Sequence, residues 1–445
     1  MIATEVKYKK TGNEWVPEIP EHWEILKAKN IGYFEGSTVD KKIVKHDKLV
    51  RIVNFLDIYN NETFEITEDV DFMKVSATEH QIKNLKVNVG DVVFTPSSEV
   101  REDIGKSAVI KYSADDLLFS YHVSRLKFTR EIDINFKKYL FNNKPALKHF
   151  SKNCKGSTRK ILNRIDFKNL PVYLPPIDEQ IIIAKFLDAQ SNQITHFIQT
   201  KQRFIELLKE QRQSIITHAV TKGMDEKAVM KETVLGEIPE HWEVRRLKFM
   251  AEVNFSTVDK HSHKAEKQVR LCNYVDVYKH EYITNDFDFM IATATDAEIK
   301  RFTVEKGDVI ITKDSETAAD IAIPALVVED LENVVCAYHL AHIKPKRELI
   351  ESEFLFRLFQ SKKINSHFEV AAKGVTRHGL SYDDINSVFL PYPPTLKEQQ
   401  EIIKHIKTES RTLDIAISKA EREIELIKEY REAMIAEAVT GKMKL

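Results

Sequence analysis

Hydrophobic positions are most regular in two long stretches, residues 178–222 and 397–440, and neither stretch contains proline or glycine. In the first stretch apolar residues recur at intervals of seven, four, seven, three and seven, which is the a/d repeat of a coiled coil. Each stretch predicts one helix of about 65 Å at roughly 1.5 Å per residue. Gly223 and Gly441 follow as candidate C-caps. The predicted seam is Leu187, Ile194, Ile198, Ile205, Leu208 and Ile215, and, 219 residues later, Ile406, Leu413, Ile417, Ile424, Ile427 and Met434.

Two helices with open apolar seams each need a partner, and packing on each other is the simplest solution. The alternative is that each helix lies on its own globular domain. If the two equivalent halves are related by a pseudo-dyad, the helices pair antiparallel and the two globular parts lie at opposite ends of the pair.

The equal seams belong to an internal duplication of the whole chain. Residues 18–24, Glu-Ile-Pro-Glu-His-Trp-Glu, return unchanged at 237–243, and Ser-Thr-Val-Asp-Lys at 37–41 returns at 256–260. A period of half the chain is too long for a solenoid repeat, so we interpret it as a duplicated domain followed by a helix. The tryptophans of the repeat, Trp23 and Trp242, we interpret as packing and chain-entry features. Shorter matches pair Gly90-Asp91-Val92 with Gly307-Asp308-Val309, Tyr121-His122 with Tyr338-His339, and Thr158-Arg159 with Thr376-Arg377.

Outside the helices, short apolar or alternating runs bounded by turns predict strands, and a helical tail follows them. The expected fold class is therefore α+β: two similar domains joined by two long helices packed as an antiparallel coiled coil, with internal pseudo-two-fold symmetry. In the first half the expected strands are 49–58, 89–95, 107–112 and 122–128, and the expected helices are 133–142 and 145–152.

Composition narrows the class of protein. The 445 residues carry 67 Lys+Arg against 68 Asp+Glu, which excludes a uniformly basic DNA-coating protein but not basic faces on a neutral body. No apolar run approaches the roughly 18 residues of a membrane span, and the N-terminus lacks the apolar region of a secretory signal. Three distant cysteines argue against a disulfide framework. We expect a cytoplasmic protein with no membrane contact.

Catalytic signatures are weak throughout the sequence, so we predict no catalytic residue and no metal site in this chain. Gly105-Lys106-Ser107 resembles the tail of a P-loop, but Val100 stands where the first glycine is needed. His261 and His263 with Cys272 lack a second ligand pair. A nuclease alternative rests on Glu298-Ile299-Lys300; its repeat counterpart begins with Gln81, and no Pro-Asp precedes it.

The charge becomes uneven in the helical tail of each half. Between Lys137 and Lys168 ten basic residues face one acid, Asp166, and residues 356–378 repeat the bias more mildly. Each segment contains a Gly-x-Thr-Arg turn, at 156–159 and 374–377. Basic segments suit contact with phosphates, and arginine suits the reading of base edges. The alternative is a charged helix face that contacts only solvent. The recurrence in both halves favours nucleic acid.

A di-proline and a Glu-Gln pair stand before each long helix, in Leu174-Pro175-Pro176-Ile177-Asp178-Glu179-Gln180 and in Tyr392-Pro393-Pro394-Thr395-Leu396-Lys397-Glu398-Gln399. Together with the Ile-Pro-Glu-His-Trp openings and the Gly-x-Thr-Arg turns, these motifs resemble the specificity (S) subunit of type I restriction–modification systems. The resemblance covers essentially the whole chain. It implies target-recognition domains at 1–177 and 224–396 and long helices at 178–223 and 397–445.

The resemblance also implies a function. Each recognition domain would read one half of a split, asymmetric site in double-stranded DNA, and the helices would set the gap. Two methyltransferase (M) subunits would methylate adenine, and motor-nuclease (R) subunits would translocate and cleave DNA. S-adenosylmethionine, ATP and magnesium would be bound by those partners and not by this chain. The alternative is a coiled-coil scaffold without DNA specificity of its own, which would not need the basic turns.

We expect DNA contacts from the two turns and from the loops after the Gly-Asp-Val strands, 95–99 and 312–316, because these offer Ser, Asp, Glu and Lys to base edges. An equally good explanation is that these loops form an edge common to both domains and have a structural role only. The candidate DNA-binding residues are Lys41, Ser97, Ser98, Glu99, Lys155, Ser157, Thr158, Arg159, Lys160 and Arg164 in the first half, and Lys260, Lys313, Asp314, Ser315, Glu316, Lys373, Thr376, Arg377 and His378 in the second.

Overall fold

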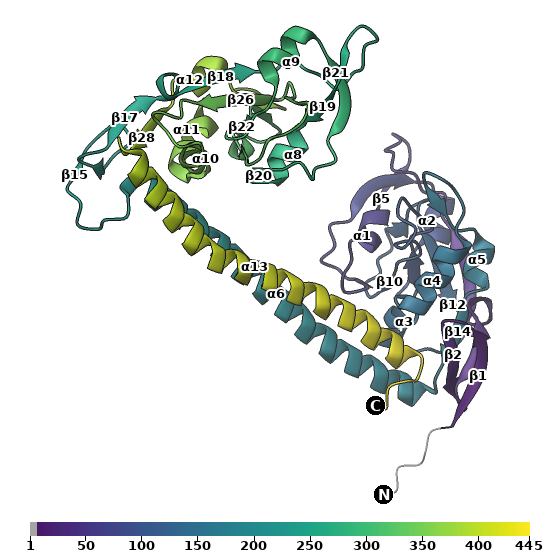
Figure 1. Ribbon diagram of the computed structural model, residues 1–445. Coiled ribbons are helices and arrows are strands. Elements are labelled where there is room, and N and C mark those ends of the chain that lie inside the picture. The colour runs from purple at the N-terminus through teal and green to yellow at the C-terminus, as the bar shows by residue number, and fades with distance from the viewer. Residues whose placement is uncertain (1–6) are drawn as a thin grey trace, which may run out of the picture. The chain divides into compact units, whose positions relative to one another are not determined.

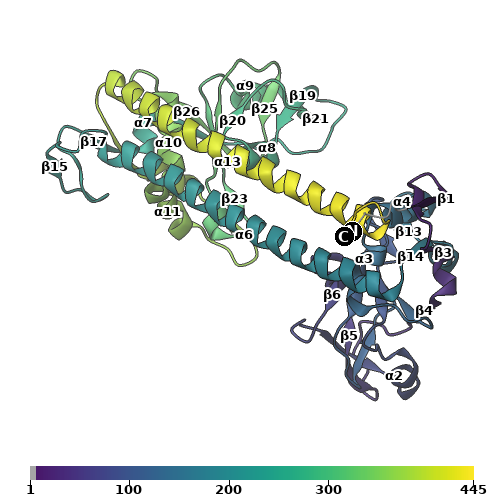
Figure 2. The same ribbon diagram turned by 90° about the horizontal axis from the view of Figure 1, so that it is seen from below.

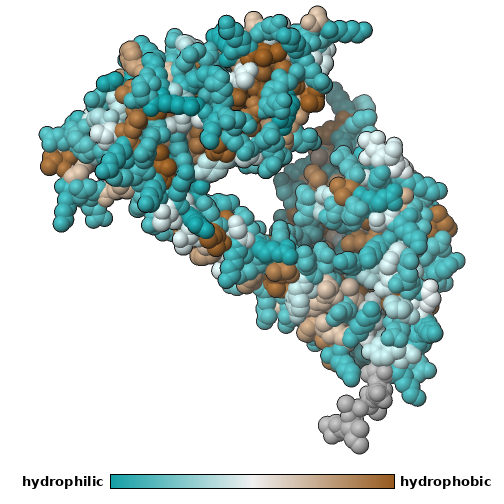
Figure 3. Space-filling view, in the orientation of Figure 1, coloured by the Kyte–Doolittle hydropathy of each residue, from teal (hydrophilic) through white to brown (hydrophobic). Residues whose placement is uncertain are grey.

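A computed structural model describes residues 7–445. The chain forms two compact units, the first from residues up to 201 and from 422–445, the second from residues 202–421. Each unit therefore holds one globular domain together with parts of the helices α6 (Ile177–Lys222) and α13 (Leu396–Val439) (Figure 1). Hydrophilic residues dominate the face of each unit that Figure 3 shows, with hydrophobic residues in small patches.

The globular domain of the first unit is built on two sheets. A five-stranded sheet has the order β4-β12-β8-β10-β6, and a three-stranded sheet has the order β11-β5-β7. Residues from both sheets share one hydrophobic cluster. The strands are β4 (Gly32–Gly36), β12 (Ser124–Phe128), β8 (Val92–Phe94), β10 (Ser107–Ile110), β6 (Glu65–Ile66), β11 (Leu117–Phe119), β5 (Lys48–Val53) and β7 (Met73–Ala77). Two-stranded pairs are β1 (Tyr8–Asn13) with β2 (Val16–Pro20), β3 (Glu24–Lys27) with β14 (Pro171–Leu174), and β9 (Ser97–Ser98) with β13 (Lys160–Ile161).

The globular domain of the second unit repeats this topology. Its sheets have the orders β18-β26-β22-β24-β20 and β21-β19-β25, which match the first unit strand for strand. The strands are β18 (Ala251–Phe255), β26 (Leu340–Pro345), β22 (Val309–Thr312), β24 (Pro324–Val327), β20 (Tyr282–Ile283), β21 (Met290–Ala294), β19 (Lys267–Cys272) and β25 (Val334–Cys336). The two-stranded pairs are β15 (Met230–Lys231) with β16 (Ile238–Pro239), β17 (Glu243–Arg246) with β28 (Phe389–Tyr392), and β23 (Asp314–Ser315) with β27 (His378–Gly379). The duplication read from the sequence is confirmed as a duplication of fold.

Short helices surround the sheets of both domains. Asp133 caps α3, and Pro145 lies in the first turn of α4, which begins one residue before the expected helix. The helices of the first unit are α1 (Phe55–Tyr59), α2 (Glu79–Leu85), α3 (Ile134–Phe141), α4 (Lys144–Asn153) and α5 (Arg164–Lys168), with a 3₁₀ turn at Ala28–Asn30. Those of the second are α7 (Leu247–Met250), α8 (Tyr274–Lys279), α9 (Asp296–Phe302), α10 (Ser352–Gln360), α11 (Lys362–Ala371) and α12 (Tyr382–Asn386), with a 3₁₀ turn at Ala318–Asp320.

One expected strand is wrong in its second part. The run at 49–58 forms strand β5 only as far as Val53, and helix α1 begins at Phe55. Asn54 accounts for the change, because its side chain accepts a hydrogen bond from the Phe55 amide and its own amide donates to Asp57 at 2.7 Å. This capping box starts a helix despite the β-forming residues that follow.

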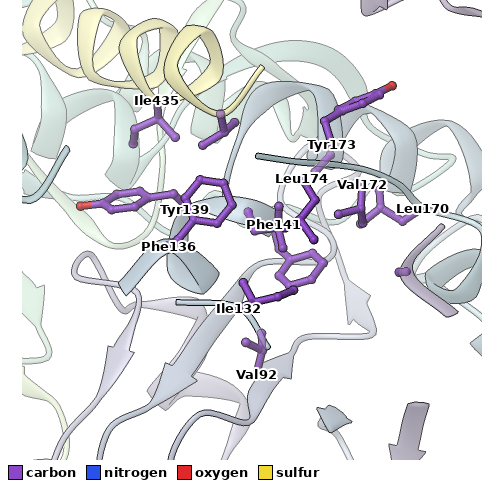
Figure 4. Close-up of a cluster of buried hydrophobic side chains, with 14 of the residues drawn as sticks. Val92, Ile132, Phe136, Tyr139, Phe141, Leu170, Val172, Tyr173, Leu174 and Ile435 are labelled. Atoms are coloured by element: carbon purple, nitrogen blue, oxygen red, sulfur yellow. The ribbon is translucent and has the colours of Figure 1, made fainter. Parts of the chain in front are cut away.

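The core of the first unit joins its five-stranded sheet to the long helices. Phe94 packs edge-to-face on Phe141 and Phe167, with ring centroids 5.1 and 5.4 Å apart. Figure 4 shows Ile435 of α13 next to Phe136 and Tyr139 of α3. The globular domain and the helix ends are therefore parts of one hydrophobic core.

The parts of α6 and α13 lie side by side in both views within each unit, and they run antiparallel (Figure 2). In the first unit Lys201 forms an ion pair with Glu423 at 2.5 Å, and in the second unit Arg212 of α6 pairs with Asp414 of α13 at 2.9 Å. The predicted coiled-coil pairing is confirmed within each unit. Of the predicted seam, Leu187, Ile194, Ile198, Ile205, Ile406, Leu413, Ile417 and Met434 are buried, and Leu208, Ile215, Ile424 and Ile427 are partly buried.

The seam shifts by one position near the end of α6, where Ile216 is fully buried and Ile215 is not. Ile216 belongs to the core of the second globular domain, so packing on that domain replaces the coiled-coil repeat at this point. The glycines after the helices have the predicted C-cap geometry, with φ of +75° at Gly223 and +71° at Gly441.

The repeated tryptophan motif attaches each domain to the start of a long helix, which confirms its structural role. The indole Nε1 of Trp23 donates to Glu179 at 2.9 Å, and His22 lies 2.6 Å from the same carboxylate. In the second unit Trp242 donates to Glu398 at 2.8 Å. The neighbouring glutamines of the two Glu-Gln pairs are buried and bond to backbone groups of their own domain; Gln180 accepts from the Asp133 amide at 2.9 Å.

A charged cluster fastens the second domain to both long helices. Arg212 contacts Glu281 at 2.7 Å as well as Asp414, and the buried Arg357 of α10 lies 3.4 Å from Glu281. Burial alone would raise the pKa of Glu281, but the hydrogen bond from Arg212 and the two arginine charges outweigh burial and hold this pKa below its usual value.

Candidate functional site

The two Gly-x-Thr-Arg turns have the same backbone geometry in the two units. In each, a bridge between the residue before the glycine and a later residue closes the turn: Lys155 with Ile161, and Lys373 with Gly379. Gly156 has φ of +108°, and a Cβ there would lie 2.1 Å from the Arg159 carbonyl oxygen. Gly374 has φ of +143° and the corresponding distance is 1.9 Å. Only glycine fits at these positions.

Pairing of short strands brings each turn against the loop that follows the Gly-Asp-Val strand. In the first unit β13 pairs antiparallel with β9, which places Lys160 opposite Ser98. In the second unit β27 pairs with β23 in the same way, with His378 opposite Ser315. The structure therefore joins the two segments that the sequence offered as separate candidates.

In the first unit the turn arginine is lightly held. Arg159 Nε donates to Ser97 Oγ at 3.2 Å, and the rest of the side chain is exposed. Burial lowers the pKa of the nearby His122, and the positive charges of Lys41 and Arg159 lower it further. Lys41 and Arg159 therefore place positive charge beside a histidine that favours its neutral form, and within residues 7–445 no carboxylate is bound to this arginine.

In the second unit the turn arginine is paired with a carboxylate. Arg377 Nη2 and Nε donate to Asp314 Oδ1 at 2.5 and 3.1 Å. His339 Nδ1 lies 2.8 Å from Asp314 Oδ2 and 3.0 Å from Arg377 Nη2, and Lys313 Nζ lies 3.7 Å from the same carboxylate. The aligned positions thus hold Ser97 and Asp314, and the electrostatics of the two turns differ.

Aromatic rings adjoin both turns, and the sequence interpretation did not assign them to the site. Tyr121 packs on His122 with ring centroids 3.8 Å apart, and Tyr338 packs on His339 at 3.6 Å. The sequence marks these rings only by the repeated Tyr-His pair, which aligns the two halves but does not by itself indicate a binding site. Stacked rings also lie in α1 and α8; the first pair is Phe55 with Tyr59 at 5.1 Å.

The predicted DNA-binding residues fall into exposed and buried groups. Ser97, Ser98 and Ser315 are buried, and Lys160 donates to the carbonyls of Gly156 and Ser157 at 2.8 and 2.6 Å, so these four stabilise the paired turn and loop. Partly buried residues are Lys313, Asp314 and His378. The exposed group is Lys41, Glu99, Lys155, Ser157, Thr158, Arg159, Arg164, Lys260, Glu316, Lys373, Thr376 and Arg377. Their contact with DNA stays a prediction.

The basic segment of the first half does not form one continuous surface. Lys137 and Lys138 are buried; Lys137 Nζ donates to the Gly90 carbonyl at 3.0 Å, and Lys138 pairs with Glu65 and with Asp188 of α6. Their aliphatic stems pack in the domain while their charges are satisfied there. Counting charges along the sequence overstated the basic face for this reason.

Glu298, on which the nuclease alternative depends, has a structural role. Glu298 caps helix α9, because its carboxylate accepts hydrogen bonds from the Thr295 amide at 3.0 Å and from the Thr257 hydroxyl at 2.7 Å. Among residues 7–445 no group of three or more His, Cys, Asp or Glu side chains is placed to hold a metal ion. No helix in the same part of the chain is long and apolar enough to cross a membrane.

Comparison with known proteins decides the family. The model of the type I restriction modification DNA specificity domain matches the chain twice, at residues 20–207 and 239–426. The chain belongs to this family. Its two matches coincide with the two repeats, so the specificity subunit contains one recognition domain in each half.

Relatives match the specificity subunit over nearly their full length. The putative type I restriction enzyme MjaX specificity subunit of Methanocaldococcus jannaschii is 24% identical over 99% of this chain and 97% of its own. The type I restriction enzyme EcoKI specificity subunit of Escherichia coli K12 is 22% identical over 96% of this chain and 90% of its own. A solved structure described as a type I R-M system aligns over 96% of this chain and 99% of its own, with a TM-score of 0.68 and 14% identity, which shows a shared fold. The protein is therefore a DNA sequence-specificity subunit of the type I systems.

Proposed function

We propose that this specificity subunit reads a split, asymmetric site in double-stranded DNA, with one half-site read by each recognition domain. The observation that supports the proposal is a single scaffold that is built twice and carries different side chains: Arg159 beside Ser97 in one unit, and Arg377 beside Asp314 in the other. Two readers with the same backbone and different polar groups are suited to two different half-sites.

The chemistry of the complex belongs to partners in this proposal. Two methyltransferase subunits bound to this chain use S-adenosylmethionine to methylate adenine, and motor-nuclease subunits use ATP and magnesium to translocate and cleave unmodified DNA. Adenine must be extruded from the duplex into a catalytic pocket, and in this proposal the methyltransferase subunits supply that pocket. The long helices set the distance between the half-sites.

The test is specific DNA binding by arginine variants. Arg159→Ala and Arg377→Ala should each weaken binding to the cognate site by about 1–3 kcal/mol, with little change in thermal stability. Arg130→Ala and Arg246→Ala are the matched controls, one arginine from each unit outside the turns. Electrophoretic binding assays with the full chain measure the effect, and unchanged affinity in both turn variants would remove the turns from the interface.

The scaffold alternative makes a different prediction. A coiled-coil scaffold would bind duplex DNA no better with its cognate sequence than without it, and the turn variants would behave like their controls. Sequence-dependent, salt-sensitive binding by the full chain would exclude it.

A further inference from the structure

The second residue of the Gly-x-Thr-Arg turn is polar in the first unit and apolar in the second. The two turns align residue for residue, so that Ser157 of the first corresponds to Val375 of the second. Val375 is 95% exposed, more than any other large hydrophobic side chain in residues 7–445. Single exposed hydrophobic residues are common on protein surfaces, so the surroundings of this valine decide whether its exposure has a function.

The turn that carries Val375 is closed by its own backbone. The amide of Lys373 donates to the Gly379 carbonyl at 3.1 Å, and the amide of Gly379 donates back at 2.9 Å. Strand β27, which follows the turn, pairs with β23. Inside the turn the chain folds so closely that a Cβ on Gly374 would lie 1.9 Å from the Arg377 carbonyl oxygen. The backbone of Val375 is therefore held in place at the tip of a tight turn.

The arginine of the same turn fastens this tip to the neighbouring loop. Arg377 pairs at 2.5 Å with Asp314, whose side chain is only 15% exposed, and His339 holds the same carboxylate at 2.8 Å. Thr376, between Val375 and Arg377, is exposed. An apolar side chain and a charged one therefore stand two residues apart on the segment that we expect to contact DNA.

Thymine is the base that an apolar side chain recognises in the major groove. Its C5-methyl group is exposed there, and an apolar contact with this methyl group distinguishes thymine from the other bases. Valine suits the contact because it has no hydrogen-bonding group and because its branched side chain has few rotamers, so little conformational freedom is lost on binding. Serine offers a hydroxyl group, which forms hydrogen bonds with several bases and does not recognise a methyl group.

We propose that Val375 contacts the C5-methyl group of a thymine in the second half-site, and that Ser157 makes no such contact in the first. This inference rests on the proposed function, because it names one base contact within one half-site. An apolar pocket of a partner protein could also cover an exposed valine. The position of Val375 beside Thr376 and Arg377, in a closed turn that is repeated in both units, favours DNA.

The experiment removes single methyl groups from the DNA. The full chain first selects its site from a random duplex library, and each thymine of the second half-site, on either strand, is then replaced in turn by deoxyuridine, which lacks only the C5-methyl group. One of these replacements should weaken binding by wild type about four-fold. Val375→Ser should bind the thymine and deoxyuridine forms of that site equally, and the first turn shows that serine is accommodated at this place.

Val370→Ser is the matched control, because Val370 is 86% exposed in the same unit but belongs to helix α11 and not to the turn. This variant should keep the full effect of deoxyuridine. A methyl effect that persists in Val375→Ser, or that is absent in wild type, would overturn the inference and leave the proposed function intact. Val375→Ser that binds DNA like wild type but no longer binds the methyltransferase subunit would assign the valine to a protein contact and overturn the inference as well. Selection of no split site by wild type would refute the proposed function itself.

Discussion

Gly223 and Gly441 provide a matched test of how tightly the C-terminal end of each long helix packs on its domain. Both follow the last turn of a long helix, and both have a left-handed backbone, with φ of +75° and +71°. Their surroundings differ. A Cβ on Gly441 would lie 2.3 Å from Pro20 Cδ and 3.2 Å from Trp23, whereas on Gly223 the nearest atom is Trp242 Cζ2 at 3.4 Å.

These distances separate two costs of an alanine substitution. A left-handed conformation costs an L-residue about 1–2 kcal/mol relative to glycine, and both variants have this cost. The contact at Gly223 is ordinary packing, so Gly223→Ala should cost about 1–2 kcal/mol in total. At Gly441 the Cβ would overlap the Pro20 ring, which adds about 1–3 kcal/mol of overpacking. Gly441→Ala should therefore cost about 2–5 kcal/mol.

Hydrogen exchange is the suitable assay, because a chain with two units need not unfold in one step. Every 1.4 kcal/mol corresponds to ten-fold in the opening equilibrium. Exchange around Trp242 and the end of α6 should accelerate about 5- to 30-fold in Gly223→Ala. Exchange around Trp23 and the end of α13 should accelerate at least about 30-fold in Gly441→Ala. Equal acceleration in the two variants, or a larger effect at Gly223, would refute the packing argument.

Three further predictions concern the helices and their anchors. A fragment of residues 1–231, which contains one recognition domain and one seam, should dimerise and direct methylation of a palindromic split site. Light scattering measures the dimer and methylation sequencing measures the site. A monomeric fragment would contradict the prediction. Four residues inserted after Glu210 add about 6 Å and roughly 40° of rotation to the helix, so the DNA spacer that the complex accepts should grow by about one or two base pairs. The measurement is methylation mapped on a library of DNA sites with different spacers. An active variant with the spacer preference of wild type would contradict the prediction. Glu281→Gln should destabilise the second unit at neutral pH and weaken the acid dependence of its melting. Because the folded pKa of Glu281 lies below the usual 4.5, its stabilisation is full above about pH 4.5 and lost as pH falls through the lowered value; thermal unfolding with the same pH profile as wild type contradicts this.

The sequence predicted best where local pattern and tertiary packing agree. The seam residues are apolar at the same positions in both halves and predict two long helices, a glycine follows each helix as its C-cap, and the relation between the two halves predicts the antiparallel pairing. The two matching sheets also follow from the repeat, since similar sequences form similar folds. The prediction failed at 49–58, where β-forming residues continue past Asn54 but its side chain starts a helix.

The candidate site was predictable only as a set of segments. The repeated Gly-x-Thr-Arg turns were visible, and their glycines are required by positive φ and close backbone contact. Charge counted along the chain did not distinguish exposed lysines from Lys137 and Lys138, which are buried and whose amino groups are hydrogen-bonded or ion-paired inside the unit. Burial depends on which element a side chain faces, and this is fixed by packing.

Sequence alone determined that this protein has two copies of one domain, two long helices with equal apolar seams, and an arginine in the same turn of each half. These features are periodic or repeated, so each can be read from neighbouring residues without knowledge of distant ones. Tertiary structure alone decided the partner of each arginine. Arg159 meets Ser97 across 62 residues and Arg377 meets Asp314 across 63, because β13 pairs with β9 and β27 pairs with β23. The contacts of the two turn arginines are therefore a property of long-range pairing.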